Sequence, residues 1–217
     1  MKAVVFDMDG ILFNTEWLCM TTWTQVAEKK GIKNMKEVFF QCVGRSSADT
    51  KMIFEENYGE AFSYEAFRNE AQVLYDEYIE TNGVPLKEGV YEILAFLKEK
   101  GLKIGLASST RYERVIEKLK AAEIYDYFSV VIGGDMVEHS KPDPDIYLKA
   151  CKALEVDPKE AVAIEDSYNG IRSAEGAGLR TVMVPDLLPK TEEMEGLSYC
   201  ICDSLLDLIK RGDIWQH

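Results

Sequence analysis

A regular alternation of short apolar runs and amphipathic segments, from residue 103 onward, constrains the fold most. The runs read as strands at 103–109, 129–134, 161–167 and 181–185, and the segments as helices at 111–122, 144–154, 169–177 and 204–210. Such alternation is typical of right-handed βαβ units in a parallel sheet. An earlier apolar run, AVVF at residues 3–6, predicts a further buried strand. The chain is therefore expected to have an α/β fold.

A different pattern separates the first strand from the rest. Three helix-like segments follow one another at 16–30, 47–58 and 64–81, and a glycine stands just beyond each as a stop signal. No convincing strand appears among them. We predict an α-helical cap domain over residues 14–84, inserted into an α/β core domain made of residues 1–13 and 85–217.

Charge and composition narrow the class of partner. The chain has 38 acidic and 25 basic residues and a net charge of −13, which disfavours nucleic acid and anionic membranes. No apolar run approaches the ~18 residues that span a bilayer. The five cysteines include no C-x-x-C pair, so we expect reduced thiols in a cytoplasmic protein.

Polar side chains gather where the predicted strands end. Ligands of open α/β sheets bind outside these carboxyl ends. The polar residues at the ends are Asp7, Asp9, Ser108, Ser109, Glu165 and Asp166, with Lys141 in the loop after the 129–134 strand. Each alone has a plainer reading, as a turn residue, a helix cap or a surface charge. Their coincidence at one edge of the sheet favours a functional site.

This set of groups suits phosphoryl transfer through a carboxylate. A phosphate ester repels an attacking carboxylate, so a hard cation such as Mg²⁺ is needed, with Asp7, Asp166 and the Asp9 backbone carbonyl as candidate ligands. The Ser108 hydroxyl and neighbouring backbone N–H groups could bind phosphate oxygens, and Lys141 adds a positive charge. One of the two N-terminal aspartates would attack phosphorus and the other would protonate the leaving oxygen.

Four motifs together resemble a known family. FDMDGILFNTE, LASST, KPDPDIY and IEDSYNG, in this order, are similar to the motifs of the haloacid dehalogenase superfamily, in the branch of β-phosphoglucomutase and related phosphatases. The resemblance covers nearly the whole chain. It implies a Rossmann-like core with an inserted helical cap, and phosphatase activity with Mg²⁺ as cofactor.

The resemblance also assigns roles to individual residues. It implies Asp7 as the nucleophile, Asp9 as the general acid/base, and a phosphate site made by Ser108, Ser109 and Lys141. The implied metal site comprises Asp7, Asp9, Glu165 and Asp166. Candidate substrate contacts in the cap are Glu16, Gly44 and Arg45, although Arg45 could equally be a solvated side chain.

Three functions remain open from the sequence. The favoured one is a Mg²⁺-dependent phosphatase of a small phosphorylated metabolite, acting as a monomer. The second is a sugar phosphomutase, which in this family is associated with a histidine in the first cap helix; the matching position here is Cys19. A cysteine is no substitute for histidine as a proton switch near neutral pH. The third is a receiver-like module that accepts phosphate on an aspartate.

Overall fold

The structure, a computed structural model, describes residues 1–43 and 47–216. The chain forms two compact units. The first, here called the core unit, comprises Met1–Asn14 and Leu86–His217, and the second, the cap unit, comprises Thr15–Pro85. Within the described ranges, none of the helices combines the length and the apolar character that crossing a membrane requires.

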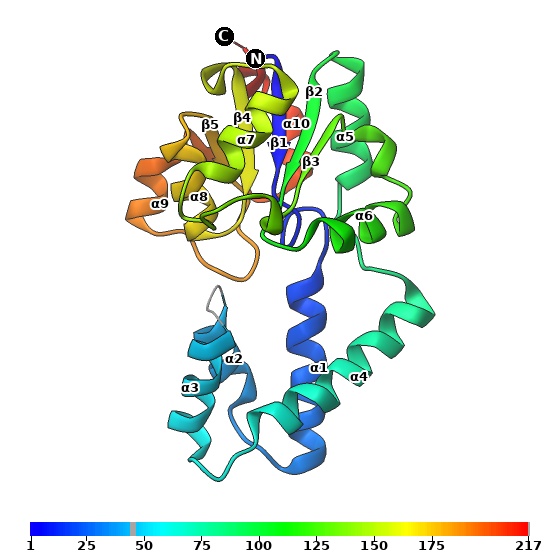
Figure 1. Cartoon of the computed structure of the whole chain (residues 1–217), viewed down its shortest axis with the longest axis vertical. Coiled ribbons are helices and arrows are strands. Elements are labelled where there is room, and N and C mark those ends of the chain that lie inside the picture. The colour runs from blue at the N-terminus through cyan, green and yellow to red at the C-terminus, as the bar shows by residue number, and fades with distance from the viewer. Residues whose placement is uncertain (44–46, 217) are drawn as a thin grey trace. The chain divides into compact units, whose positions relative to one another are not determined.

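The core unit is built on one parallel sheet, so the predicted α/β class is confirmed. Its strands lie in the spatial order β3-β2-β1-β4-β5-β6, and each neighbouring pair is parallel (Figure 1). Their bounds are β1 (Ala3–Phe6), β2 (Lys103–Ala107), β3 (Val130–Ile132), β4 (Ala161–Glu165), β5 (Arg180–Met183) and β6 (Cys200–Ile201). The two-residue strand β6 was not predicted, because so short a run has no readable period.

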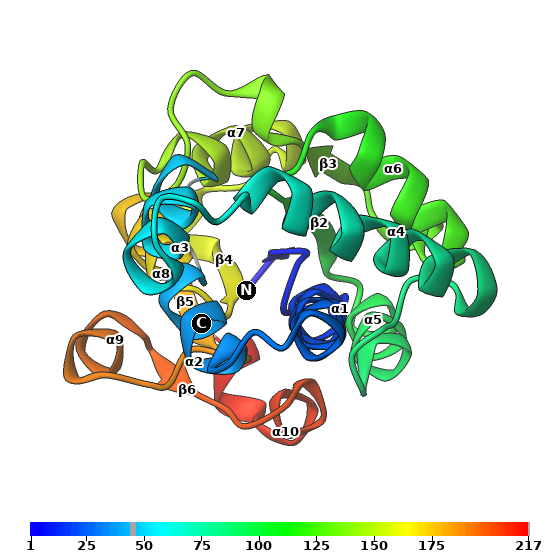
Figure 2. The same cartoon turned by 90° about the horizontal axis from the view of Figure 1, so that it is seen from below.

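Helices cover both faces of the sheet. On one face lie α7 (Asp145–Leu154) and α8 (Tyr168–Gly176), which contact the strands and each other. On the other face α5 (Val90–Glu99) packs on β2 and on α10 (Leu205–Lys210), as Figure 2 shows. The remaining helices of this unit are α6 (Tyr112–Ala121) and α9 (Glu192–Leu197). Covered on two faces, a central strand must be apolar throughout, and all four residues of β1 are fully buried.

The cap unit contains α1 (Thr15–Lys30), α2 (Met35–Cys42), α3 (Ser47–Tyr58) and α4 (Tyr64–Asn82). Its core is aromatic. The Trp23 ring meets four other rings edge-on, with centroids 5.1–6.5 Å apart: Phe39, Phe54, Tyr64 and Phe67. Edge-to-face pairs at these distances add to the stability of a small helical unit.

Three helices, α2, α5 and the six-residue α9, are missing from the sequence prediction and correct it. In α9 a cap signal was present, because the Thr191 side chain accepts from the Met194 N–H. The other two lack the side-chain N-cap that usually marks a helix start: α2 follows Asn34 and α5 follows Gly89, each in the left-handed conformation with no side-chain cap bond. Their apolar residues do recur at helical spacing, as in Met35, Val38, Phe39 and Cys42. That spacing was the available signal.

Candidate active site

The register of the sheet brings the predicted site residues to one level. Phe6 pairs with Leu106 on one side and with Ile164 on the other, so the next residue of each strand, Asp7 included, stands at the same edge. The backbone N–H of Asp7 donates to the Ile164 carbonyl over 2.9 Å. Residues far apart in the chain therefore meet where the three central strands end.

Lys141 lies at the centre of this group. Its Nζ donates to Asp7 Oδ1 at 2.5 Å, to Glu165 Oε1 at 2.7 Å and to the Ala107 carbonyl at 3.0 Å. The Lys141 side chain is only 6% exposed. It also lies over the ring of Tyr147, with Nζ 5.0 Å from the ring centroid. One ammonium group thus ties the ends of β1, β2 and β4 together.

Burial and charge shift the protonation of this centre. Burial raises the pKa of Asp7 to about 7; Lys141 opposes the shift and Glu165 adds to it. Burial also disfavours the Lys141 charge, but the Asp7 and Glu165 carboxylates outweigh that penalty and hold the pKa of Lys141 well above its usual value. Lys141 therefore stays charged at neutral pH. The protonation of Asp7, in contrast, depends on any cation bound beside it, because a nearby positive charge favours the ionised carboxylate.

Glu165 is fully buried and accepts five hydrogen bonds. Its Oε1 accepts from Lys141 and from the Tyr147 hydroxyl, and its Oε2 accepts from the backbone N–H groups of Asp166 and Ser167 and from the Ser167 hydroxyl. Gly170 makes room for this carboxylate, because a Cβ at that position would overlap it. The glutamate is thereby fixed beside Lys141.

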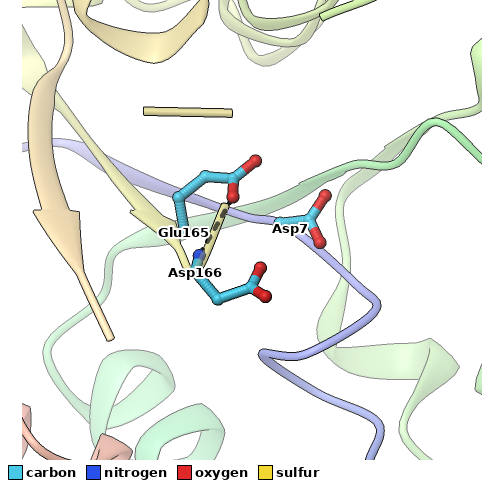
Figure 3. A group of neighbouring side chains, drawn as sticks. All are labelled: Asp7, Glu165 and Asp166. Atoms are coloured by element: carbon cyan, nitrogen blue, oxygen red, sulfur yellow. Dashed lines mark hydrogen bonds between the residues drawn. The ribbon is translucent and has the colours of Figure 1, made fainter. Parts of the chain in front are cut away.

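Three carboxylates lie close enough together to share a metal ion. Single oxygens of Asp7, Glu165 and Asp166 lie within 4.8 Å of one another, and all three residues are buried. Figure 3 shows them at the ends of their strands, with Glu165 folded back toward the Asp166 backbone. Gly10, at φ +89°, allows the loop after β1 to approach Asp166, because a Cβ there would overlap the Asp166 carboxylate.

Asp9 is held by two donors from the segment that follows β2. Lys118 Nζ lies 2.9 Å from Asp9 Oδ1, and the Thr110 hydroxyl donates to Asp9 Oδ2 over 3.1 Å. Sequence reasoning missed both donors. Lys118 stands 109 residues away along the chain, in the middle of α6. No motif or spacing in the sequence could have linked it to Asp9.

The two serines of the LASST motif differ in position. Ser108 is buried, and its hydroxyl accepts from the Thr110 N–H over 3.1 Å, whereas Ser109 is exposed. Neither serine caps the next helix. Instead the Asp135 carboxylate accepts from the backbone N–H of Tyr112, the first residue of α6.

The candidate residues predicted in the cap unit are Glu16, Gly44 and Arg45. Glu16 lies in the first turn of α1. Gly44 and Arg45 lie outside the described residues. Tyr147, which was also missed, did carry a signal: it is the last residue of KPDPDIY and follows Lys141 by six positions.

Comparison with known proteins agrees with the resemblance. A family model for haloacid dehalogenase-like hydrolases matches residues 4–184. A phosphorylated carbohydrates phosphatase of Thermotoga maritima is 34% identical over 186 residues, which cover 84% of each chain. A beta-phosphoglucomutase of Bacillus subtilis is 33% identical over 193 residues, covering 85% of this chain and 83% of that protein.

A solved structure extends the likeness to three dimensions. CbbY from Rhodobacter sphaeroides, solved in complex with phosphate, superposes with a TM-score of 0.71 at 27% identity over 96% of each chain. The predicted family is therefore confirmed on sequence and on fold. The chain belongs to the haloacid dehalogenase-like hydrolase family, as an enzyme of its phosphatase type.

Proposed function

We propose that this enzyme hydrolyses phosphorylated carbohydrates through a phosphorylated Asp7, with Mg²⁺ as its cofactor. The observation that carries the proposal is the buried Asp7 carboxylate at the end of β1, bonded to the Lys141 ammonium over 2.5 Å. A carboxylate that must attack an anionic ester needs positive charge beside it, and Lys141 supplies it. The substrate class is supported by the phosphorylated carbohydrates phosphatase among the relatives.

The reaction divides into two displacements at phosphorus. In the first, an Asp7 oxygen forms a bond to phosphorus while the ester P–O bond breaks, and Asp9 gives its proton to the departing alcohol. In the second, water attacks phosphorus, Asp9 takes the water's proton and the Asp7–phosphorus bond breaks. Inorganic phosphate leaves, and Asp7 is again a carboxylate. The hydroxyl of Ser108 and the N–H group of Ser109 are the proposed donors to phosphate oxygens.

The donor set fits Mg²⁺, which prefers carboxylate and carbonyl oxygens. Asp7 and Asp166 are the proposed side-chain ligands, with the backbone carbonyl of Asp9. Glu165 is the third acid within reach, but its oxygens already accept five hydrogen bonds, so its main contribution is to hold Lys141. A bound Mg²⁺ would neutralise charge between the phosphate and the carboxylates.

Phosphatase action is favoured over mutase action by the thiol at position 19. Burial raises the pKa of Cys19 to about 12, with Glu16 adding to the shift, so this side chain is neutral near pH 7. A neutral thiol lacks the proton switch that the family resemblance associates with the mutases. The mutase remains the second candidate, because a beta-phosphoglucomutase is among the relatives. We further infer a monomeric cytoplasmic enzyme that does not bind nucleic acid.

The first test replaces the nucleophile. Asp7→Asn should fold as the wild type does by circular dichroism and lose nearly all turnover, whereas Asp203→Asn, at an exposed position, is the matched control. Residual activity above about a hundredth of the wild-type rate would contradict covalent catalysis by Asp7. Multiple turnovers of p-nitrophenyl phosphate by the wild type would exclude the receiver-like alternative.

The second test addresses the metal and the products. EDTA should abolish turnover and Mg²⁺ should restore it, while Ca²⁺ should inhibit because its looser shell misplaces the nucleophile. Full activity in EDTA would remove the metal from the proposal. For the mutase, β-glucose 1-phosphate is supplied with a trace of the 1,6-bisphosphate. Glucose 6-phosphate forming faster than free phosphate would establish the mutase instead.

A further inference from the structure

Lys118 stands out because it is a charged residue of the core unit beside a proposed catalytic group, with no role in the reaction as described above. Its Nζ lies 2.9 Å from Asp9 Oδ1, and the two side chains are 24% and 32% exposed. An ordinary surface ion pair of this kind contributes little to stability. Stability alone is therefore a weak explanation for the contact.

The two oxygens of Asp9 are fixed by separate donors from one segment. Oδ1 bonds Lys118 and Oδ2 accepts from the Thr110 hydroxyl over 3.1 Å. A carboxylate held at both oxygens has lost its freedom to rotate about χ1 and χ2. The pair of contacts therefore defines the direction in which Asp9 points, without occupying Asp7 or Lys141.

The helix that carries Lys118 is itself anchored. Its neighbours Val115 and Leu119 are fully buried, so α6 is fixed on the core unit through that face. The start of α6 is tied by the Tyr112 N–H bond to Asp135, over 2.8 Å. Lys118 thus reaches Asp9 from a rigid support, as residues that orient catalytic groups usually do.

We propose that Lys118 is a positioning residue: with Thr110 it orients the Asp9 carboxylate for proton transfer to the leaving alcohol. The inference rests on the proposed function, in which Asp9 is the general acid. Proton donation matters when the leaving group is a poor one, and hardly at all when it departs readily as a stable anion. The role of Lys118 therefore predicts a dependence on the leaving group.

The test compares two substrates by kcat/KM, which reports the reaction up to release of the first product. The leaving group of glycerol 2-phosphate is an alkoxide, which needs a proton. The leaving group of p-nitrophenyl phosphate is p-nitrophenolate, which departs as a stable anion. Lys118→Met should lower kcat/KM about tenfold for glycerol 2-phosphate, as expected when a catalytic group is displaced by a fraction of an ångström. The loss for p-nitrophenyl phosphate should be less than about threefold.

Three further variants complete the design. Lys118→Arg should recover most of the activity, because a guanidinium also reaches and bonds a carboxylate. Lys120→Met, at an exposed position of the same helix, is the matched control and should change neither substrate's kcat/KM. Asp9→Asn tests the proposed function itself and should show a larger leaving-group dependence than Lys118→Met.

The outcomes separate the two hypotheses. Equal losses for both substrates in Lys118→Met, or no loss for either, would overturn the positioning role while Asp9→Asn still supports the general acid. If Asp9→Asn shows no leaving-group dependence, the proposed function fails, whatever Lys118→Met does. If Lys118→Met does not fold, Lys118→Gln takes its place in the comparison, because glutamine keeps a hydrogen-bond donor but not the charge.

Discussion

Removing the Lys141 ammonium should strongly destabilise the core unit. In Lys141→Met, the methionine fills much of the same volume but leaves two buried carboxylates side by side. The side chains of Asp7 and Glu165 are 12% and 0% exposed. Neither can compensate for the loss by reaching water, so the centre changes from a net charge of −1 to −2 in a buried environment.

The expected loss of unfolding free energy follows from the distances between the Lys141 ammonium and the two carboxylates. At an effective dielectric constant of 20, contacts of 2.5 and 2.7 Å correspond to a gross attraction of about 6–7 kcal/mol each. Much of this offsets the cost of removing three charges from water, and breaking a buried pair usually costs 3–5 kcal/mol net. Glu165 keeps four other donors, so the loss falls mainly on Asp7. We therefore expect Lys141→Met to lower the free energy of unfolding by about 3 kcal/mol, at the lower end of that range.

The assay is urea unfolding followed by tryptophan fluorescence and circular dichroism at pH 8 without metal. At that pH Asp7 of the wild type, with its pKa raised to about 7, is largely ionised, so nearly the whole attraction to Lys141 is present and is lost in the variant. At pH 6 the aspartate takes up a proton and the loss should shrink. Adding Asp7→Asn to Lys141→Met removes the charge on which the loss mainly falls and should restore most of the lost stability.

The matched control is Lys120→Met, which removes an exposed lysine. It should change the unfolding free energy by less than about 0.5 kcal/mol. If Lys141→Met were no more destabilising than this control, or if its effect did not depend on pH between 6 and 8, then Lys141 would not be compensating buried charge and the reasoning would be refuted.

Two further predictions concern the neighbours of this centre. Gly170→Ala should lower the unfolding free energy by at least about 2 kcal/mol and reduce activity, because its Cβ would displace the Glu165 carboxylate. The control Gly196→Ala, at a position with open space around it, should be neutral or stabilising. Similar unfolding curves for the two variants would contradict this packing argument. The affinity for Mg²⁺ should weaken about tenfold for each pH unit below 7 and level off above it, because a proton and the metal compete for Asp7, whose pKa is raised to about 7. Titration calorimetry from pH 5.5 to 8 measures this, and a flat profile would exclude Asp7 as a ligand.

The end of the first strand shows how far local sequence reaches. AVVF followed by Asp7 is an abrupt change from apolar to charged, and the structure places the same change at the edge of the sheet. The predicted strands at 103–109 and 161–167 end in polar residues in the same way. In a parallel sheet such ends must lie together, so the prediction that Asp7, Ser108 and Asp166 share one edge needed only periodicity and the βαβ rule.

Two of the three helices that escaped prediction, α2 and α5, show where local sequence is no longer informative. The N-cap of α4 is readable, since Ser63 accepts from the Ala66 N–H, and that helix was expected. For α2 and α5 the chain enters the helix through a left-handed residue with no capping side chain. Their stability comes from burying one face against other elements, which is a property of the folded unit.

By itself, the sequence determined the class of the sheet, the inserted helical region and the residue types at the strand ends. Only the tertiary structure decided which donor each carboxylate receives. Lys141 bonds Asp7 across 134 positions of the chain, and Lys118 bonds Asp9 across 109. Periodicity reports which face of an element is buried, because that depends on neighbours three or four residues away. A hydrogen bond between distant side chains depends on the packing of whole helices onto the sheet, and local sequence does not encode that arrangement in any pattern that can be read from it.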